Sequence, residues 1–162
     1  MKRIIFSLSF LIILFVLCSC NNKTEQLQAK LDSLEQNAYK PGFGEFMTYV
    51  QIHHDKLWFA GLNQNWPLAD FELNEIKEAI AGIQKYEKDR KESQLVIMAS
   101  IPLDSVGMAI QQKNPDMFKS TFTSLTNTCN NCHKQVNFGF NVVKIPDTPP
   151  FSNQDFKPAS AK

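Results

Sequence analysis

The sequence lacks an excess of either charge, any basic surface pattern and any sustained alternation of apolar and polar residues. Its 17 lysines and arginines nearly balance its 16 aspartates and glutamates, which gives a formal net charge of +1 in 162 residues. Because no basic stripe or interleaving of basic with aromatic residues is present, nucleic acid is excluded as a partner. Because alternation is missing, strands are not expected outside the C-terminal tail, and a single all-α domain is predicted.

The first 20 residues have the layout of an export signal. A basic start precedes an apolar run from Ile4 to Leu17, and small residues follow. The end of this region, "LCSC", resembles the lipobox of bacterial lipoproteins, in which cleavage precedes a cysteine that is then acylated. The resemblance implies a signal peptide over residues 1–19, lipid on Cys20, and a location in the periplasm or cell envelope, anchored to a membrane. A plain signal peptide or a single anchor helix is the alternative, and both also export the domain.

The four cysteines would normally suggest disulfide bonds in an exported protein. Here Cys18 leaves with the signal peptide and Cys20 is expected to carry lipid, so that only Cys129 and Cys132 remain. No disulfide framework is therefore predicted, and the remaining pair is available for other chemistry.

The rest of the chain divides into a tether, a helical domain and a tail. Residues 20–41 are polar and their leucines form only a short helical stripe, so they are predicted to be a tether. Apolar residues recur at steps of three and four through 42–137, which predicts an antiparallel four-helix bundle. Residues 138–162 contain four prolines and no helical period, yet phenylalanines recur as far as Phe156. They are expected to pack on the bundle as an extended tail.

The predicted helices have identifiable boundaries. The first spans about 43–61, and the second and fourth begin after Asn65 and Asn114, which can cap helices that have a proline in the first turn. The third covers 96–110 and contains Pro102, which is predicted to kink or divide it. The side chains predicted to face inward are Ala69, Leu73, Ile76, Ile80 and Ile83 on the second helix, Val96, Ala99, Leu103, Val106 and Ile110 on the third, and Phe118, Phe122, Leu125, Cys129, Cys132 and Val136 on the fourth.

The segment "TNTCNNCHKQ" contains Cys129, Cys132 and His133 in the pattern C-x-x-C-H. A thiol redox pair would lie at the start of a helix that follows a strand, whereas this pair lies late in a predicted helix. A structural zinc ion would need four ligands, drawn from the two cysteines and from His53, His54 and His133. Covalent haem uses each motif residue once, with two cysteine thioethers and His133 as the proximal iron ligand. Export agrees with haem, because bacteria attach haem outside the cytoplasm, and one haem c is predicted.

Apolar residues near the motif suit a flat apolar macrocycle. Phe122 and Leu125 precede the cysteines on the same predicted helix, and Phe138 follows them. Val50 lies on the first predicted helix, opposite them in the expected bundle. These four side chains are predicted to contact the haem.

A four-helix bundle with C-x-x-C-H on its last helix resembles the cytochrome c prime family. The segments "VQIHHDKLWFAG", "NWPLADFEL" and "PPFSNQ" are similar to those of related exported single-haem bundle cytochromes, and the likeness covers roughly residues 42–156. The resemblance implies that the first helix covers the distal side of the haem, and that homodimers form through the first two helices. Two departures are Asn137, where the family usually has a basic residue, and the long tail. Five-coordinate iron is therefore not carried over.

The sixth iron ligand decides between functions. The candidates on the first helix are His53, His54 and Met47, and Val50 would leave the position open. His53 is preferred, because its helical track is otherwise apolar and a buried imidazole needs a partner. A histidine favours electron transfer, a methionine raises the potential, and an open site binds NO or CO. Electron transfer with an unidentified redox partner is the first expectation and gas binding the second. Weak peroxidase activity comes third, because no distal acid–base arrangement is recognisable.

Overall fold

The computed structural model describes residues 23–159, which belong to two units that meet between Lys40 and Pro41. In the first unit residues 23–37 are helical, and all residues from 23 to 40 are exposed. The predicted tether therefore contains a helix whose leucine stripe is not buried. The predicted signal peptide and the lipid site at Cys20 lie outside the described residues.

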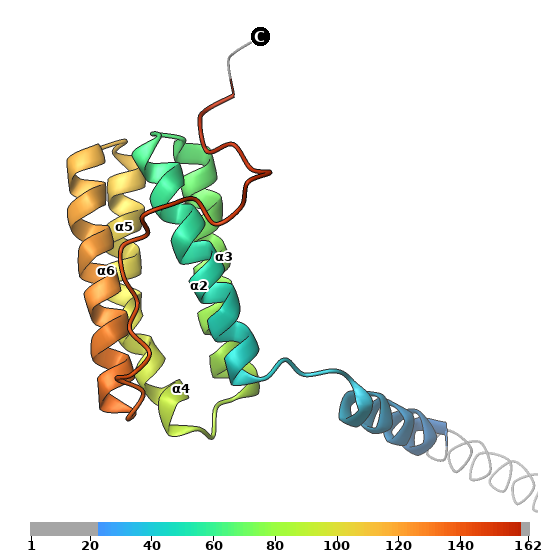
Figure 1. Ribbon diagram of the computed structural model, residues 1–162. Helices are drawn as coiled ribbons and strands as arrows, with labels where there is room; N and C mark the ends of the chain where they lie inside the picture. The colour runs from blue at the N-terminus through green and yellow to red at the C-terminus, as the bar shows by residue number, and fades with distance from the viewer. Residues whose placement is uncertain (1–22, 160–162) are drawn as a thin grey trace, which may run out of the picture. The chain divides into compact units, whose positions relative to one another are not determined.

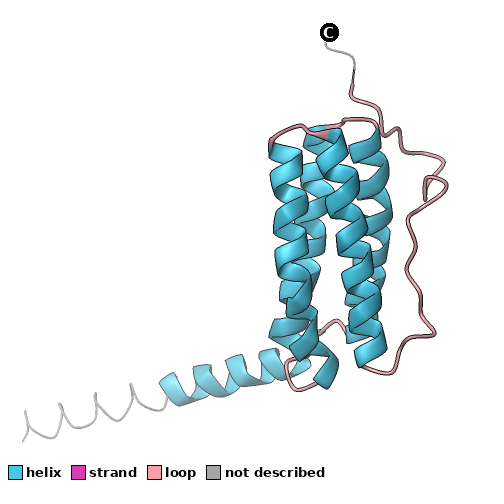
Figure 2. Ribbon diagram, turned by 90° about the vertical axis from the view of Figure 1, so that its left-hand side faces the viewer, coloured by secondary structure: helices cyan, strands magenta, loops and turns pink. Residues whose placement is uncertain are grey.

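The second unit is a bundle of helices followed by a tail (Figures 1 and 2). No strand is assigned between residues 23 and 159, so the all-α prediction is confirmed for this part of the chain. The long helices α2, α3, α5 and α6 lie side by side (Figure 1). Short connections join α2 to α3 and α5 to α6, whereas α4 and η1 lie between α3 and α5. The elements are α2 (Phe43–Leu62), α3 (Trp66–Tyr86), α4 (Lys91–Leu95), a 3-10 helix η1 (Val96–Ala99), α5 (Ser100–Gln111) and α6 (Pro115–Gln135).

The two predicted helix caps are present, and both use an asparagine side chain that accepts a hydrogen bond from the backbone three residues later. The side-chain oxygen of Asn65 accepts a hydrogen bond from the backbone N–H of Leu68 at 3.4 Å, and Asn114 accepts from Met117 at 3.0 Å. Such bonds satisfy amide groups that the first turn of a helix leaves unpaired. Gln64 precedes Asn65 and Lys113 precedes Asn114, and both preceding residues have a left-handed backbone conformation. This conformation lets the chain reverse its direction within a short connection.

The third predicted helix is divided, as Pro102 indicated. Proline lacks an N–H group, and Pro102 lies in the first turn of α5, where that group would have no helical partner. The residues before it form η1 and α4 instead of a continuous α-helix. By length and composition alone, the stretch 91–111 could cross a membrane. Its apolar side chains Leu103 and Val106 are buried in the bundle, whereas Ile97, Ile101 and Met108 are exposed.

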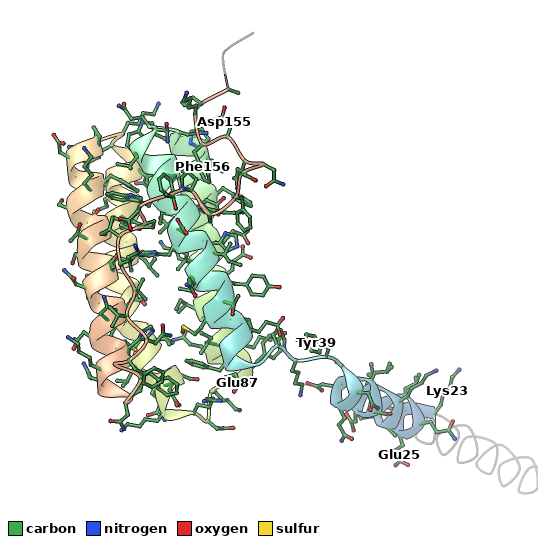
Figure 3. All side chains as sticks on the ribbon, in the orientation of Figure 1. Lys23, Glu25, Tyr39, Glu87, Asp155 and Phe156 are labelled. Carbon is green, nitrogen blue, oxygen red and sulfur yellow. The ribbon has the colours of Figure 1, made fainter. Side chains whose placement is uncertain are left out.

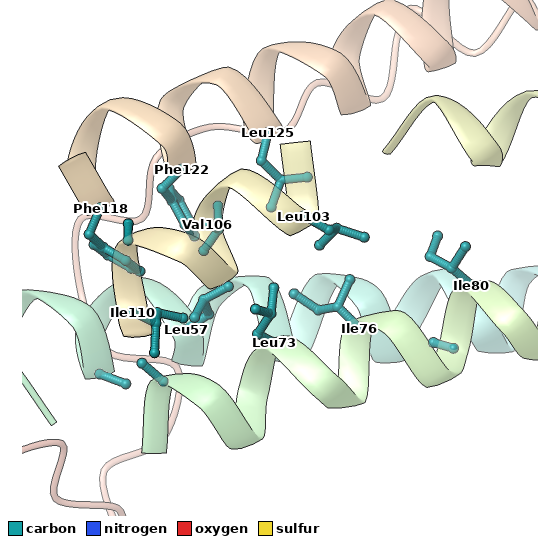
Figure 4. Packing of buried hydrophobic residues seen from close by; sticks show 14 of the residues in the cluster. Leu57, Leu73, Ile76, Ile80, Leu103, Val106, Ile110, Phe118, Phe122 and Leu125 are labelled. Carbon is teal, nitrogen blue, oxygen red and sulfur yellow. The ribbon is translucent and has the colours of Figure 1, made fainter. Parts of the chain in front are cut away.

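The core contains the predicted inward faces of α3 and α5 and the first half of α6 (Figure 4). The aromatic rings of Phe118 and Phe122 are fully buried, with centroids 5.8 Å apart. The tail runs along the bundle without regular secondary structure (Figure 2). It is held at Phe156, which is buried with its ring centroid 5.8 Å from that of Phe59 (Figure 3). The tail packs as predicted, because its apolar residue near the end has a core surface to cover.

Candidate cofactor site

A cavity of about 670 Å³ opens in the half of the bundle that contains the cysteine motif. Its volume lies within the roughly 300–1,000 Å³ of small-molecule and cofactor sites in proteins. Apolar side chains from several elements line it, among them Met47 and Val50 of α2, Ile76 of α3, Val96 of η1, Leu125 of α6 and Phe138 of the tail. The cavity can therefore hold a large apolar group.

All three motif residues line this cavity. Phe118, Phe122 and Leu125 are almost completely buried earlier on α6, whereas Cys129 and Cys132 are half-buried free thiols. Cys129 and Cys132 were predicted to lie on the buried face of this helix, but they are less buried than that prediction implied. This face points to the centre of the bundle as expected, but the cavity takes the place of packed side chains at this end.

The surroundings of the thiols do not suit a redox nucleophile. Burial, with a smaller contribution from the neighbouring Cys132, raises the pKa of Cys129 to about 11. Burial also raises the pKa of Cys132. Reactive thiolates instead have a lowered pKa, caused by cationic neighbours or a helix N-terminus. Both thiols are therefore protonated at neutral pH.

His133 is held in a defined tautomer by the tail. Its Nδ1 atom lies 2.7 Å from the backbone carbonyl oxygen of Asn141, which can only accept a hydrogen bond. Nδ1 therefore carries the hydrogen, and Nε2 keeps its lone pair. Metal-binding histidines are commonly oriented by such a second hydrogen bond, which also makes the ligating nitrogen more basic.

The end of α6 explains how the tail reaches His133. Asn137 has a φ of 66°, and the backbone N–H of Phe138 donates to the carbonyl of His133 at 2.8 Å. The N–H of Asn137 donates to the carbonyl of Lys134 at 3.3 Å, which completes a Schellman motif. Asparagine adopts this left-handed conformation more readily than most residues. Asn137, a departure from the family pattern in the sequence, therefore turns the chain back over the motif.

His53, the preferred sixth ligand, does not line the cavity. Its Nδ1 atom lies 2.6 Å from a carboxylate oxygen of Glu72, and its Nε2 atom lies 3.8 Å from Glu75. The Nζ atom of Lys56 lies 3.9 Å from a carboxylate oxygen of Glu72. The imidazole of His53 is half-buried, and its partner is a carboxylate of α3.

Glu72, to which the sequence interpretation gave no functional role, is the buried partner of His53. Its side chain is 1% exposed, although glutamate is rarely buried without a partner. Its position could have been found, because Glu72 lies three residues after Ala69 and four before Ile76, on the inward face of α3. Together with His53 and Lys56 it forms a charged cluster outside the cavity.

His54 and Met47 both line the cavity, as do the predicted contacts Val50, Leu125 and Phe138. The Nε2 atom of His54 lies 2.9 Å from the hydroxyl of Thr126, and this hydroxyl also bonds the carbonyl of Phe122. Iron coordination through Nε2 would therefore require breaking the bond to Thr126. Met47, the third predicted candidate, lines the cavity without such a hydrogen bond among the described residues.

Phe122 lies behind His54 instead of lining the cavity. The centroids of the two rings are 4.4 Å apart, and Phe122 is fully buried. His54 lines the cavity, whereas Phe122, which was predicted to contact the cofactor, is not among its lining residues. Its role is to support His54 from the core side.

Asp55 brings a titratable group to the cavity that the sequence interpretation did not single out. Within the described residues, its Oδ1 atom is the buried side-chain oxygen without a hydrogen-bond partner. Burial raises the pKa of this carboxyl group. Burial disfavours the charged form of a carboxyl group, so Asp55 is easier to protonate than an exposed aspartate.

The side chains that the zinc alternative would use as ligands are not gathered at one place in the described part of the chain. Among residues 23–159, no group of three or more histidine, cysteine or carboxylate side chains is placed to hold a metal ion. His53 is engaged by Glu72 and His54 by Thr126, so neither joins the cysteines. The motif residues instead share a cavity wall.

The burial of His54 is expected to make the free energy of unfolding decrease as the pH falls from 7 to 4. Burial lowers the pKa of His54 from 6.5 to about 4. Between these values the unfolded chain binds a proton that the folded chain does not, so stability falls as the pH falls. The loss should reach about 3 kcal/mol at pH 4. Urea unfolding from pH 7 to pH 4 measures it.

The variant His54→Gln provides the comparison for this measurement. Glutamine does not titrate, so the variant should lose the His54 contribution over the same pH range. The opposite contribution of Asp55, whose raised pKa favours the folded state at low pH, is present in both proteins and cancels in the difference. Equal pH dependence in the two proteins would show that His54 is not buried in its neutral form.

Comparison with known proteins does not identify a family or a function for this chain. No protein-family model, curated protein or solved structure matches the chain.

Proposed function

We propose that this chain is a single-haem c-type cytochrome that transfers single electrons outside the cytoplasm. The observation that carries the proposal is the hydrogen bond between His133 and Asn141, which leaves Nε2 as the free nitrogen beside a cavity that two cysteines also line. A histidine held in this way, next to a C-x-x-C pair, has the donor set of covalently bound haem.

The residues present fit the size and chemistry of that cofactor. Cys129 and Cys132 would carry the thioether bonds, and His133 would ligate the iron. Leu125, Phe138 and the other apolar side chains would exclude water from the macrocycle. When bound, haem supplies a reversible one-electron change of its iron.

Two features of the cavity support electron transfer. Met47 offers a thioether sulfur on α2, and a methionine ligand raises the reduction potential of haem iron. Phe138 lines the cavity and is still 41% exposed, so the cavity lies close to the surface, where a redox partner can approach. Met47 therefore replaces His53 as our preferred sixth ligand.

Binding of a diatomic gas such as NO or CO is the second candidate. It is favoured by the engagement of His53 with Glu72 and of His54 with Thr126, because neither histidine then reaches the iron. Asp55 adds a polar side chain to the cavity wall, with a buried oxygen that has no hydrogen-bond partner among the described residues. If Met47 also stays away from the iron, the sixth position is open.

The reaction of the ferrous protein with CO separates the two functions. We expect the unmodified protein to be low-spin and slow to bind CO, because the sulfur of Met47 occupies the sixth position. Met47→Ala should convert it to a high-spin form that binds CO at once. Met108→Ala is the matched control, since Met108 lies on α5 and is 48% exposed. Immediate CO binding by the unmodified protein would favour the gas-binding function.

The setting of the protein is part of the same proposal. Lipid on Cys20 would anchor it to a membrane of the cell envelope and keep it near redox partners that are still unidentified. A homodimer through α2 and α3 is supported by exposed aromatic residues on both helices, Tyr49 and Phe71.

A further inference from the structure

Asn130, one of the two residues between the motif cysteines, binds the backbone of the tail. Its Nδ2 atom donates a hydrogen bond to the carbonyl of Val143 at 2.7 Å, and its Oδ1 atom accepts one from the N–H of Val143 at 2.8 Å. One side-chain amide thus satisfies both backbone groups of a residue that belongs to no helix or strand. Asn131, the next residue of the motif, is exposed and does not share these bonds.

The bonded segment forms part of the cavity wall. We use the name strap for residues 138–146, which leave the end of α6 and turn back along it. Val142, Val143 and Pro146 of the strap line the cavity. Two α6 side chains bind strap backbone, Asn130 at Val143 and His133 at Asn141. The two bonded residues of the strap are separated by one residue, so fixing Val143 restricts the carbonyl of Asn141.

We infer that Asn130 is a positioning residue, which fixes the strap so that the Asn141 carbonyl holds His133 with Nε2 free for iron. The role in iron ligation rests on the proposed function, whereas the fixing of the strap does not. An amide is needed because it supplies a donor and an acceptor together. Aspartate could accept from the N–H of Val143, but its carboxylate would face the carbonyl oxygen.

Hydrogen exchange of the Val143 amide tests the fixing of the strap. In the exported protein, Asn130→Ala should accelerate this exchange on the order of tenfold or more, because opening no longer breaks the two bonds. Asn131→Ala is the matched control and should leave the rate unchanged. Asn130→Asp keeps the hydrogen-bond acceptor, so its Val143 exchange rate should lie between the rates of the Asn130→Ala and Asn131→Ala variants. It replaces Asn130→Ala in the test if the alanine variant does not fold. Equal rates in the Asn130 and Asn131 variants would overturn the inference.

The iron–histidine bond tests the second step. Loss of the Asn141 hydrogen bond makes His133 a weaker donor, so Asn130→Ala should raise the midpoint potential. It should also lower the Fe–N stretching frequency, which is measured in the high-spin ferrous form of the Met47→Ala protein. Asn131→Ala should change neither. Faster Val143 exchange with an unaltered stretching frequency would overturn the positioning of His133. Absence of haem from the unmodified protein would instead refute the proposed function, and the exchange comparison would still decide whether Asn130 fixes the strap.

Discussion

Replacing Cys129 and Cys132 together with alanine is expected to abolish covalent haem attachment, if the chain is the c-type cytochrome proposed above. The two thiols are free and line one cavity with His133, and the other cysteines lie in the predicted signal region. No other described side chain can form a thioether bond to the macrocycle. Denaturation followed by extraction into acidified organic solvent, with the absorption spectrum of the protein fraction, measures the loss.

The single variants and a motif control make this result specific. Each single cysteine variant should keep one thioether and show a shifted haem spectrum, because one vinyl group stays unreacted. His133→Ala should lose the iron ligand, and Asn131→Ala should retain attached haem. Extractable haem, or none at all, in the unmodified protein would refute the assignment of haem c.

Replacing Phe118 with alanine is expected to lower the free energy of unfolding by about 3–5 kcal/mol. The ring is fully buried and contacts Trp58, Trp66 and Phe122, with centroid distances of 6.2, 6.2 and 5.8 Å. Because domains of this size are typically stable by only about 5–15 kcal/mol, the loss is severe. Urea denaturation measures it. Phe140→Ala, at a phenylalanine that is 82% exposed, should change stability by about 0.5 kcal/mol or less.

Gly61 allows a second test of the same contact. A Cβ atom at this position would lie 2.1 Å from the ring of Phe118, so Gly61→Ala should lower stability by about 1–3 kcal/mol. In the Phe118→Ala background the ring is gone, and the same change should be neutral or stabilising. Additive effects of the two substitutions would show that Phe118 does not pack against this turn of α2.

The helices were predictable because their signals are local. Asn65 and Asn114 cap the helices that they precede, and the proline in the third segment divides it. The apolar residues of α3 at steps of three and four are buried together. A capping amide, a missing N–H and a helical period act within one or two turns, so the sequence carries them without reference to other helices.

The site was predictable only in part. The motif residues and the cavity contacts Val50, Leu125 and Phe138 lie together, as expected. His53 and Phe122 do not line the cavity, and Glu72 and Asp55 were not singled out. The spacing of apolar residues along a helix is the same whether that face packs against other helices or lines a cavity. The sequence therefore could not show that the cysteines are half-buried and not fully buried.

The sequence by itself determined the helical bundle, its caps and breaks, and the chemistry available at Cys129, Cys132 and His133. Only the tertiary structure decided which neighbours surround each side chain. His53 and His54 are adjacent, and one residue turns the helix by about 100°. That rotation directs one imidazole to Glu72 on α3 and the other to the cavity and Thr126 on α6. The helical period places a residue on a face, but the packing of the other helices determines what that face meets.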